Sequence, residues 1–304
     1  MYNSLFQKEW WLDAVAPGKW GAVIVRRGDE VAARLPYIME KKFGFIVLQQ
    51  PPLTPTLGPW LRNTEARPSK TLSIQKELIW ELLELMPRYD YFSQNLNPSI
   101  SSWLPFYWKG FEQTTRYTYI IEDLTDLEKI WNAFSEHARR NIRKAQKALT
   151  ISTDSDIEEF LYLNEKTFER QGKPLPYSRD FIKRMDAACL HQKARRIFLA
   201  KDNNGRTHAA VYILWDKESA YYLMGGEDPA LRNSEAGSLL MWEAIKFAAT
   251  VTKRFDFEGS MIQSVEKFFR GFGGKQTPYH KITSASKRMR VLMNGRDFIR
   301  SMRR

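Results

Sequence analysis

Residues 255–274 read Phe-Asp-Phe-Glu-Gly-Ser-Met-Ile-Gln-Ser-Val-Glu-Lys-Phe-Phe-Arg-Gly-Phe-Gly-Gly, and they are the most informative stretch of the chain. They predict a short buried strand over residues 255–257, a turn at Gly259 and Ser260, and a short aromatic helix that ends at residues 273–274. Glycine in a turn permits backbone angles that are closed to other residues, and it leaves amides open beside the strand end. The stretch therefore predicts a strand–turn–helix corner.

Length and composition limit the classes of protein that the chain can form. A chain of 304 residues exceeds the usual single-domain range, so we expect two domains. A hydrophobic content of 43%, with 13% aromatic residues, is ample for packed cores. The apolar runs are too short and too often interrupted by charge for a membrane-spanning helix, and the N-terminus lacks a signal-peptide pattern. The single cysteine, Cys189, cannot form an internal disulfide, so we expect a core thiol in a cytoplasmic protein.

The net charge of +12, from 47 basic and 35 acidic residues, favours anionic partners. These partners include phosphate-bearing cofactors, tRNA, nucleotide-linked substrates and the anionic face of a membrane. Charge alone does not choose among them.

Two similar hairpins indicate a duplicated module. β-Branched and aromatic runs flank Gly28 in the first half and Gly205 in the second, as two hairpins require. We therefore expect an α/β fold of the α+β type, with a mixed, mostly antiparallel sheet flanked by helices in each half. The expected domains are residues 1–134 and residues 135–304, the second ending in a basic helix.

A basic helix is predicted over residues 135–149, at the junction of the two halves. Apolar residues recur at helical spacing and form one stripe, while cations occupy two neighbouring rows. This pattern favours an anion-binding face, although a solvated face is the common alternative. The stripe comprises Ala138, Ile142, Ala145 and Leu149, and the rows comprise Arg139, Arg143 and Lys147, and Arg140 and Lys144.

Three passages, taken in order, resemble the acyltransferase domain of the Fem aminoacyl-transferases and their acetyltransferase-like relatives in the GNAT superfamily. They are the basic helix of residues 135–145, the strand, loop and tryptophan-bearing helix of residues 225–242, and the closing block of residues 256–274. The resemblance covers residues 130–283 well and the first half more loosely. It implies tandem GNAT-like domains and acyl transfer from an activated carbonyl to an amine.

The resemblance also implies where a donor binds. In this superfamily the amides that open a helix hold the donor's phosphates, and Arg232 and Gly237 match its coenzyme A loop, with Ser238 next in sequence. Glu235, however, occupies a glycine position of that loop, and a carboxylate there disfavours acyl-CoA. Gly259 and Ser260 complete the expected donor-binding residues.

A second departure concerns the end of the domain. Members that use aminoacyl-tRNA tend to carry Phe-Lys-x-x-Phe-Gly, whereas this chain has Phe269 at the lysine position and Arg270 beside it. We expect these two residues, with Arg139 and Arg143, to bind substrate. Asp256 and Glu258 are the candidate catalytic base and orienting group, because strand alternation would put both on one face.

The leading hypothesis is a GNAT/Fem-like N-acyltransferase that acts on an amine, such as one on a cell-envelope precursor. An acyl-CoA is the favoured co-substrate, and we expect neither a metal nor a permanently bound cofactor. One alternative is an aminoacyl-tRNA-dependent Fem-type peptidyl transferase. Another, from a different class, is a non-catalytic protein that binds nucleic acid or a membrane surface on a GNAT scaffold.

Overall fold

The computed structural model describes residues 4–64, 66–153, 156–259 and 261–293. It divides into two compact units, which are described separately below. Unit 1 comprises Met1–Arg116 and Pro278–Arg304, and unit 2 comprises Tyr117–Thr277. The chain passes from one unit to the other within strand β6 (Glu112–Ile121) and returns within strand β12 (Lys275–Ala285).

Unit 1 is built on a mixed sheet in the order β1-β2-β3-β5-β12, with β4 paired to β2. Among the described strand pairs of this unit antiparallel pairing predominates, and β3 pairs with β5 in parallel. Besides its parts of β6 and β12, the described elements are η1 (Leu5–Gln7), α1 (Glu9–Val15), β1 (Trp20–Arg27), β2 (Glu30–Lys42), β3 (Phe45–Gln49), β4 (Trp60–Leu61), α2 (Pro68–Glu84), β5 (Tyr91–Asn95) and α3 (Leu104–Trp108).

The core of unit 1 follows from its sequence pattern. Proline at the first position of α2 suits a helix start, because that amide has no partner within the helix. The apolar face of α2 then buries Leu78 and Leu82 in a cluster with Phe92 and Ile282 of the sheet. The predicted hairpin around Gly28 is confirmed as β1–β2, and that glycine has a φ of 61°.

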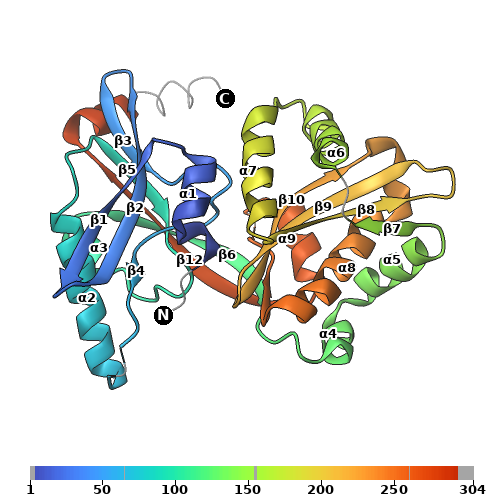
Figure 1. Cartoon of the computed structure of the whole chain (residues 1–304), viewed down its shortest axis with the longest axis horizontal. Coiled ribbons are helices and arrows are strands. Elements are labelled where there is room, and N and C mark those ends of the chain that lie inside the picture. The colour runs from blue at the N-terminus through green and yellow to red at the C-terminus, as the bar shows by residue number, and fades with distance from the viewer. Residues whose placement is uncertain (1–3, 65, 154–155, 260, 294–304) are drawn as a thin grey trace. The chain divides into compact units, whose positions relative to one another are not determined.

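Unit 2 carries the sheet order β6-β11-β10-β9-β8-β7. Helices α5 and α8 lie on one face, and α6 and α7 lie on the other (Figure 1). Besides its parts of β6 and β12, the described elements are α4 (Leu127–Ala133), α5 (Glu136–Gln146), β7 (Thr150–Thr153), α6 (Ile157–Arg170), α7 (Arg179–His191), β8 (Arg195–Lys201), β9 (Thr207–Trp215), β10 (Ser219–Glu227), η2 (Pro229–Ser234), α8 (Ala236–Val251), β11 (Arg254–Asp256) and α9 (Gln263–Arg270).

Local signals explain the helices of unit 2 that border the site. Ser135 caps α5 by accepting a hydrogen bond from the Ala138 amide. The predicted apolar stripe of α5 is buried, with Ile142 and Ala145 fully enclosed. The second predicted hairpin is confirmed as β8–β9 around Gly205.

Some expectations need adjustment or remain open. Strand β11 ends at Asp256, so Glu258 reaches its position through a turn and not through strand alternation. The predicted boundary between residues 134 and 135 falls inside unit 2, and the division into two domains there stays a prediction. The basic C-terminal helix is described only over residues 287–293, and its remainder lies outside the described residues. Among the helices described, none combines the length and apolar character that crossing a membrane requires.

Candidate active site

Two parallel strands of unit 2 separate and create an opening in the sheet. β10 pairs with β11 only from Ser219 to Tyr221. The chain after β11 then follows β6, since the Phe257 amide donates to the Tyr119 carbonyl at 3.0 Å. Beyond Tyr221, β10 stays with β9 as far as Glu227, through a bulge between Tyr222 and Met224. Beyond Tyr221 the described strands therefore leave one edge of β10 without a partner strand. Side chains of α6 bond part of this segment, because Asn164 donates to the Gly225 carbonyl at 2.7 Å and the Glu227 amide donates to the Thr167 hydroxyl at 2.9 Å.

The turn after β11 is held tightly against β6. Glu258 and Gly259 both adopt left-handed backbone angles, with φ values of 60° and 61°. A Cβ on Gly259 would lie 2.0 Å from the Tyr117 carbonyl oxygen, so no larger residue fits there without movement. Ser260, which we expected beside this glycine, lies outside the described residues.

Asp256 is a buried carboxylate at the end of β11. Its Oδ1 accepts hydrogen bonds from the Thr118 hydroxyl and from the Glu258 amide, the latter at 2.8 Å. Burial raises the pKa of Asp256 to about 6, although these hydrogen bonds oppose the shift. Burial, and then the charge of Asp256, raise the pKa of Glu258 well above its ordinary value. Two neighbouring carboxyl groups with different proton affinities result, an arrangement common at sites of acid–base chemistry.

The N-terminus of α8 follows β10 through η2. The Ser238 and Leu239 amides bond to the Glu235 carbonyl at 3.1 and 3.4 Å. Within the described chain, the Gly237 amide has no acceptor, and a Cβ on Gly237 would meet nothing within 4 Å, whereas Ala236 is buried in the core. The open Gly237 amide stands at the positive end of a 16-residue helix, a setting that suits an anion.

Glu235 adopts the conformation that the family pattern assigns to glycine. Its φ is 62°, in the left-handed region, and its side chain does not cap α8. The carboxylate instead accepts a hydrogen bond from the Asn141 amide group at 2.9 Å. This bond to α5 holds the negative charge in a fixed position next to the loop and leaves the Gly237 amide uncovered.

The two cationic rows of α5 face different neighbours. Arg139 donates to the Asn132 carbonyl at 3.4 Å, and the Arg143 guanidinium lies 5.6 Å from the centre of the Trp131 ring. The row that we expected to bind an anion therefore contacts α4. In the second row, Lys144 donates to the Asn233 carbonyl of η2. Both cationic rows were visible in the sequence. Which of them contacts η2 depends on how α5 packs against α8, and the sequence does not show this.

The remaining expected residues lie in different surroundings. Arg232 is half-exposed and forms an ion pair with Glu227 at 2.7 Å. Ser238 is buried, and Phe269 is buried with its ring 5.4 Å from that of Tyr222. Arg270 is exposed and forms an ion pair with Glu266 at 3.0 Å. Phe269 thus underlies the unpaired part of β10, whereas Arg270 points to solvent.

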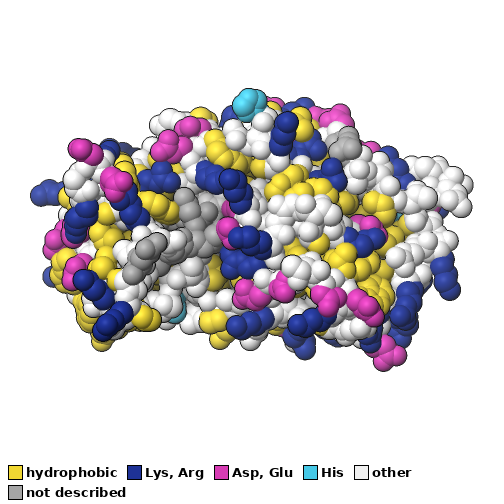
Figure 2. Space-filling view, turned by 60° about the horizontal axis from the view of Figure 1, so that its bottom comes forward, with side chains coloured by type: hydrophobic (Ala, Val, Ile, Leu, Met, Phe, Trp, Pro, Cys, Tyr) yellow, Lys and Arg dark blue, Asp and Glu magenta, His cyan; other side chains and the backbone are white. Residues whose placement is uncertain are grey.

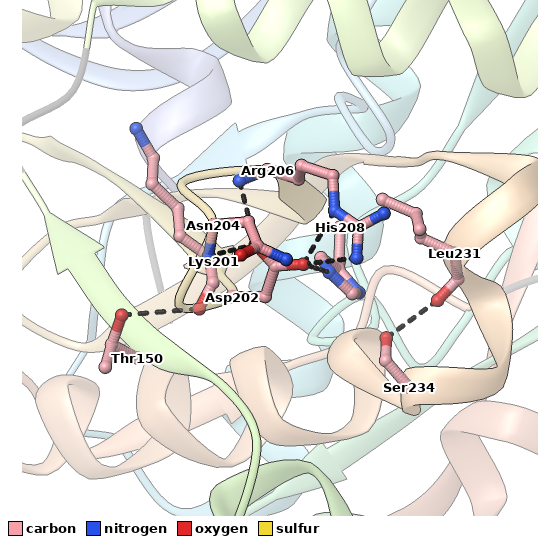
Figure 3. A network of polar contacts seen from close by, with 8 residues as sticks. All are labelled: Thr150, Lys201, Asp202, Asn204, Arg206, His208, Leu231 and Ser234. Atoms are coloured by element: carbon pink, nitrogen blue, oxygen red, sulfur yellow. Dashed lines mark hydrogen bonds and ion pairs between the residues drawn. The ribbon is translucent and has the colours of Figure 1, made fainter.

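A polar network supports the loop between β10 and α8 (Figure 3). The Asp228 amide donates to the His208 carbonyl, and Nε2 of His208 lies 3.1 Å from the Asp202 carboxylate. Although burial raises the pKa of Asp202, hydrogen bonds from His208 and Arg206 lower it below its usual range. The Ser234 hydroxyl donates to the Leu231 carbonyl at 2.8 Å within η2. These contacts give η2 a fixed conformation ahead of α8.

Basic side chains are spread widely over the surface. Figure 2 shows Lys and Arg side chains over the whole visible face, mixed with acidic ones and not gathered into a single stripe. The net charge of +12 therefore does not by itself mark one binding surface.

Comparison with known proteins agrees with this architecture. Residues 132–264 match the family model of the acetyltransferase (GNAT) domain. The structure is similar to that of FemX, with 15% identity, a TM-score of 0.68, and coverage of 91% of this chain and 92% of that chain. It is also similar to L-PGS from Bacillus licheniformis, with 12% identity, a TM-score of 0.53, and coverage of 93% and 89%.

A tandem GNAT protein from the clavulanic acid biosynthesis pathway is similar at 11% identity, with a TM-score of 0.50 and coverage of 90% and 86%. No curated protein matches the chain in sequence. The separated parallel strands, the β10 bulge and the helix that follows them define the class as a GNAT fold. The chain has a GNAT acetyltransferase domain over residues 132–264, and as a whole it has the fold of the Fem-like GNAT proteins.

Proposed function

We propose that the protein is an N-acyltransferase that moves an acyl group from an activated donor, with acyl-CoA favoured, to an amine. We further propose that it acts in the cytoplasm and that the amine belongs to a cell-envelope precursor. The observation that carries the proposal is the separation of β10 from β11 after Tyr221, which leaves a strand edge that continues through η2 to the open Gly237 amide of α8.

The residues around that edge fit a donor with a pantetheine-like arm and a pyrophosphate. An extended arm containing amides can bond the backbone groups of β10 that neither a strand nor the α6 side chains engage, as an added strand does. The Gly237 amide suits a phosphate, and Arg232 and Lys144 supply positive charge nearby. Because Glu235 bonds to Asn141, its carboxylate does not cover the Gly237 amide.

Asp256 supports the amine chemistry. The amine must lose a proton as its nitrogen bonds to the acyl carbon and the leaving group departs. Oδ1 of Asp256 is engaged by Thr118 and Glu258, but Oδ2 forms no hydrogen bond with the described residues and can accept that proton. A pKa of about 6 keeps Asp256 ionised at neutral pH while making it a better base than an ordinary aspartate. Glu258, with its raised pKa, would act as the neutral partner that orients the acceptor.

A second candidate function is transfer from an aminoacyl-tRNA. Glu235 at a glycine position favours this alternative, because a carboxylate next to the loop lowers its affinity for pyrophosphate. The net charge of +12 is also compatible with tRNA.

A melting screen with a charge-matched pair of variants tests the donor. We expect coenzyme A at about 100 times its Kd to raise the Tm of the wild type by about 5–10 °C. Gly237→Gln should keep most of this shift, and Gly237→Glu should lose it, since the position has room for either side chain and only one repels phosphate. Stabilisation by aminoacyl-tRNA and not by coenzyme A would favour the second candidate.

Activity is tested separately, by following thiol release from acyl-CoA with primary amines. The test variant is Arg232→Gln, because Arg232 pairs with Glu227 at the end of β10. Lys253→Gln is its control, because Lys253 forms a similar exposed ion pair with Glu218, which precedes β10. Arg232→Gln should raise the KM for the donor and Lys253→Gln should not. Donor binding without turnover of any amine would favour a non-catalytic anion-binding protein.

A further inference from the structure

Two cations of unit 1 share one face of its sheet. Arg116 lies on β6 and Lys281 on β12. The opposite face is marked by Gln113, whose amide contacts Nδ1 of His280 at 2.8 Å. Because side chains alternate along a strand, Arg116 and Lys281 both point away from that contact.

Within the part of the chain that the structure describes, neither cation forms an ion pair. Both side chains are partly buried, and Nε of Arg116 is fully buried without an acceptor. Burial, and then the charge of Arg116, lower the pKa of Lys281 below its ordinary value. Nε of Arg195 is also buried without a hydrogen bond, but it lies 3.0 Å from the Asp186 carboxylate, so the charge of Arg195 is paired.

Two desolvated like charges are unfavourable unless an anion lies between or beside them. A carboxylate carries one negative charge, whereas a phosphate monoester carries nearly two and offers three acceptor oxygens. The guanidinium and ammonium groups together carry two positive charges and several N–H donors, so a phosphate balances them better. We propose that Arg116 and Lys281 form an anion site in unit 1 that binds the phosphate group of a ligand.

Titration with inorganic pyrophosphate tests the site on the full chain. Lys281→Gln and Arg116→Gln each remove one charge-assisted contact, so we expect each to weaken binding by about 10- to 100-fold. Lys41→Gln is the matched control, because Lys41 is an exposed strand lysine of the same unit for which the described residues provide no ion pair. This control should bind pyrophosphate as the wild type does.

A second arm distinguishes a soluble phosphate from a lipid headgroup. Vesicles that contain phosphatidic acid, whose headgroup is a phosphate monoester, are compared with vesicles of phosphatidylcholine alone in a flotation assay. Binding of pyrophosphate that both variants weaken assigns a soluble phosphate ligand, whereas vesicle binding alone that both variants weaken assigns a headgroup. If neither probe binds, or if the variants bind both probes like the wild type, the proposal is overturned.

The ligand-free protein gives an independent readout. Removing one of two repelling, desolvated cations should raise the Tm of Lys281→Gln by about 1–4 °C in low salt, whereas Lys41→Gln should leave it unchanged. A fall in the Tm of Lys281→Gln would indicate a structural role and refute the site. None of these measurements requires acyl transfer, so they can fail or succeed independently of the proposed function.

Discussion

Gly259→Ala should destabilise unit 2 through two separate effects. Alanine at a φ of 61° adopts the left-handed conformation, which costs about 1–2 kcal/mol. The new methyl group would also lie 2.0 Å from the Tyr117 carbonyl oxygen and 2.7 Å from Cα of Thr118. Both atoms belong to the backbone of β6 and cannot turn aside, so overpacking adds about 1–3 kcal/mol. The expected total loss in free energy of unfolding is about 2–5 kcal/mol.

Gly205→Ala separates the two effects. Gly205 has a φ of 76° in the same unit, but a Cβ there would meet nothing within 4 Å. It should lose only the conformational part, about 1–2 kcal/mol. Urea unfolding followed by tryptophan fluorescence measures both variants, and the difference between them reports the clash with β6.

Gly259→Ala should also reduce activity, because the turn that contains Gly259 positions Asp256 and Glu258. A displacement of about 1 Å can lower kcat about 100-fold. Gly205→Ala should keep wild-type turnover. If Gly259→Ala loses no more free energy of unfolding than Gly205→Ala, the argument that the turn packs too closely against β6 for a methyl group is wrong.

Two further predictions concern the carboxylates of the site. Asp256 has a pKa of about 6 in the folded protein and about 3.9 when unfolded, so the folded state binds the proton more tightly and stability falls as pH rises between these values. Asp256→Asn should therefore be more stable than the wild type above pH 6, by up to about 2–3 kcal/mol, and it should lose turnover. Urea unfolding at pH 4 and pH 8 measures the stability, and parallel rate measurements follow the turnover. Unchanged turnover would remove the assignment of Asp256 as the base. Glu235→Gly relieves a left-handed non-glycine residue but loses the bond to Asn141, so stability should change by less than about 1 kcal/mol. Its affinity for coenzyme A, measured by calorimetry, should rise, and a fall would mean that the carboxylate assists the donor.

Local patterns predicted the elements of the site better than their arrangement. Glycine and alternating apolar runs predicted both hairpins, and helical spacing predicted the buried stripe of α5. The turn at Gly259 was also predicted, because glycine after a strand indicates a left-handed backbone conformation that other residues rarely adopt. Strand alternation did not extend to Glu258, since the left-handed turn begins directly after the strand.

The amino-acid sequence by itself determined where helices, hairpins and turns form, because these depend on side-chain periodicity and on glycine angles over a few residues. Only the tertiary structure decided that β10 leaves β11 after Tyr221, that Lys144 meets η2, and that Nε of Arg116 is buried without a partner. Each of these depends on which distant segments come together and exclude water, and no local pattern carries that information. The chemistry of a charged group is set by the neighbours that folding gives it, so the site became visible only when those neighbours were known.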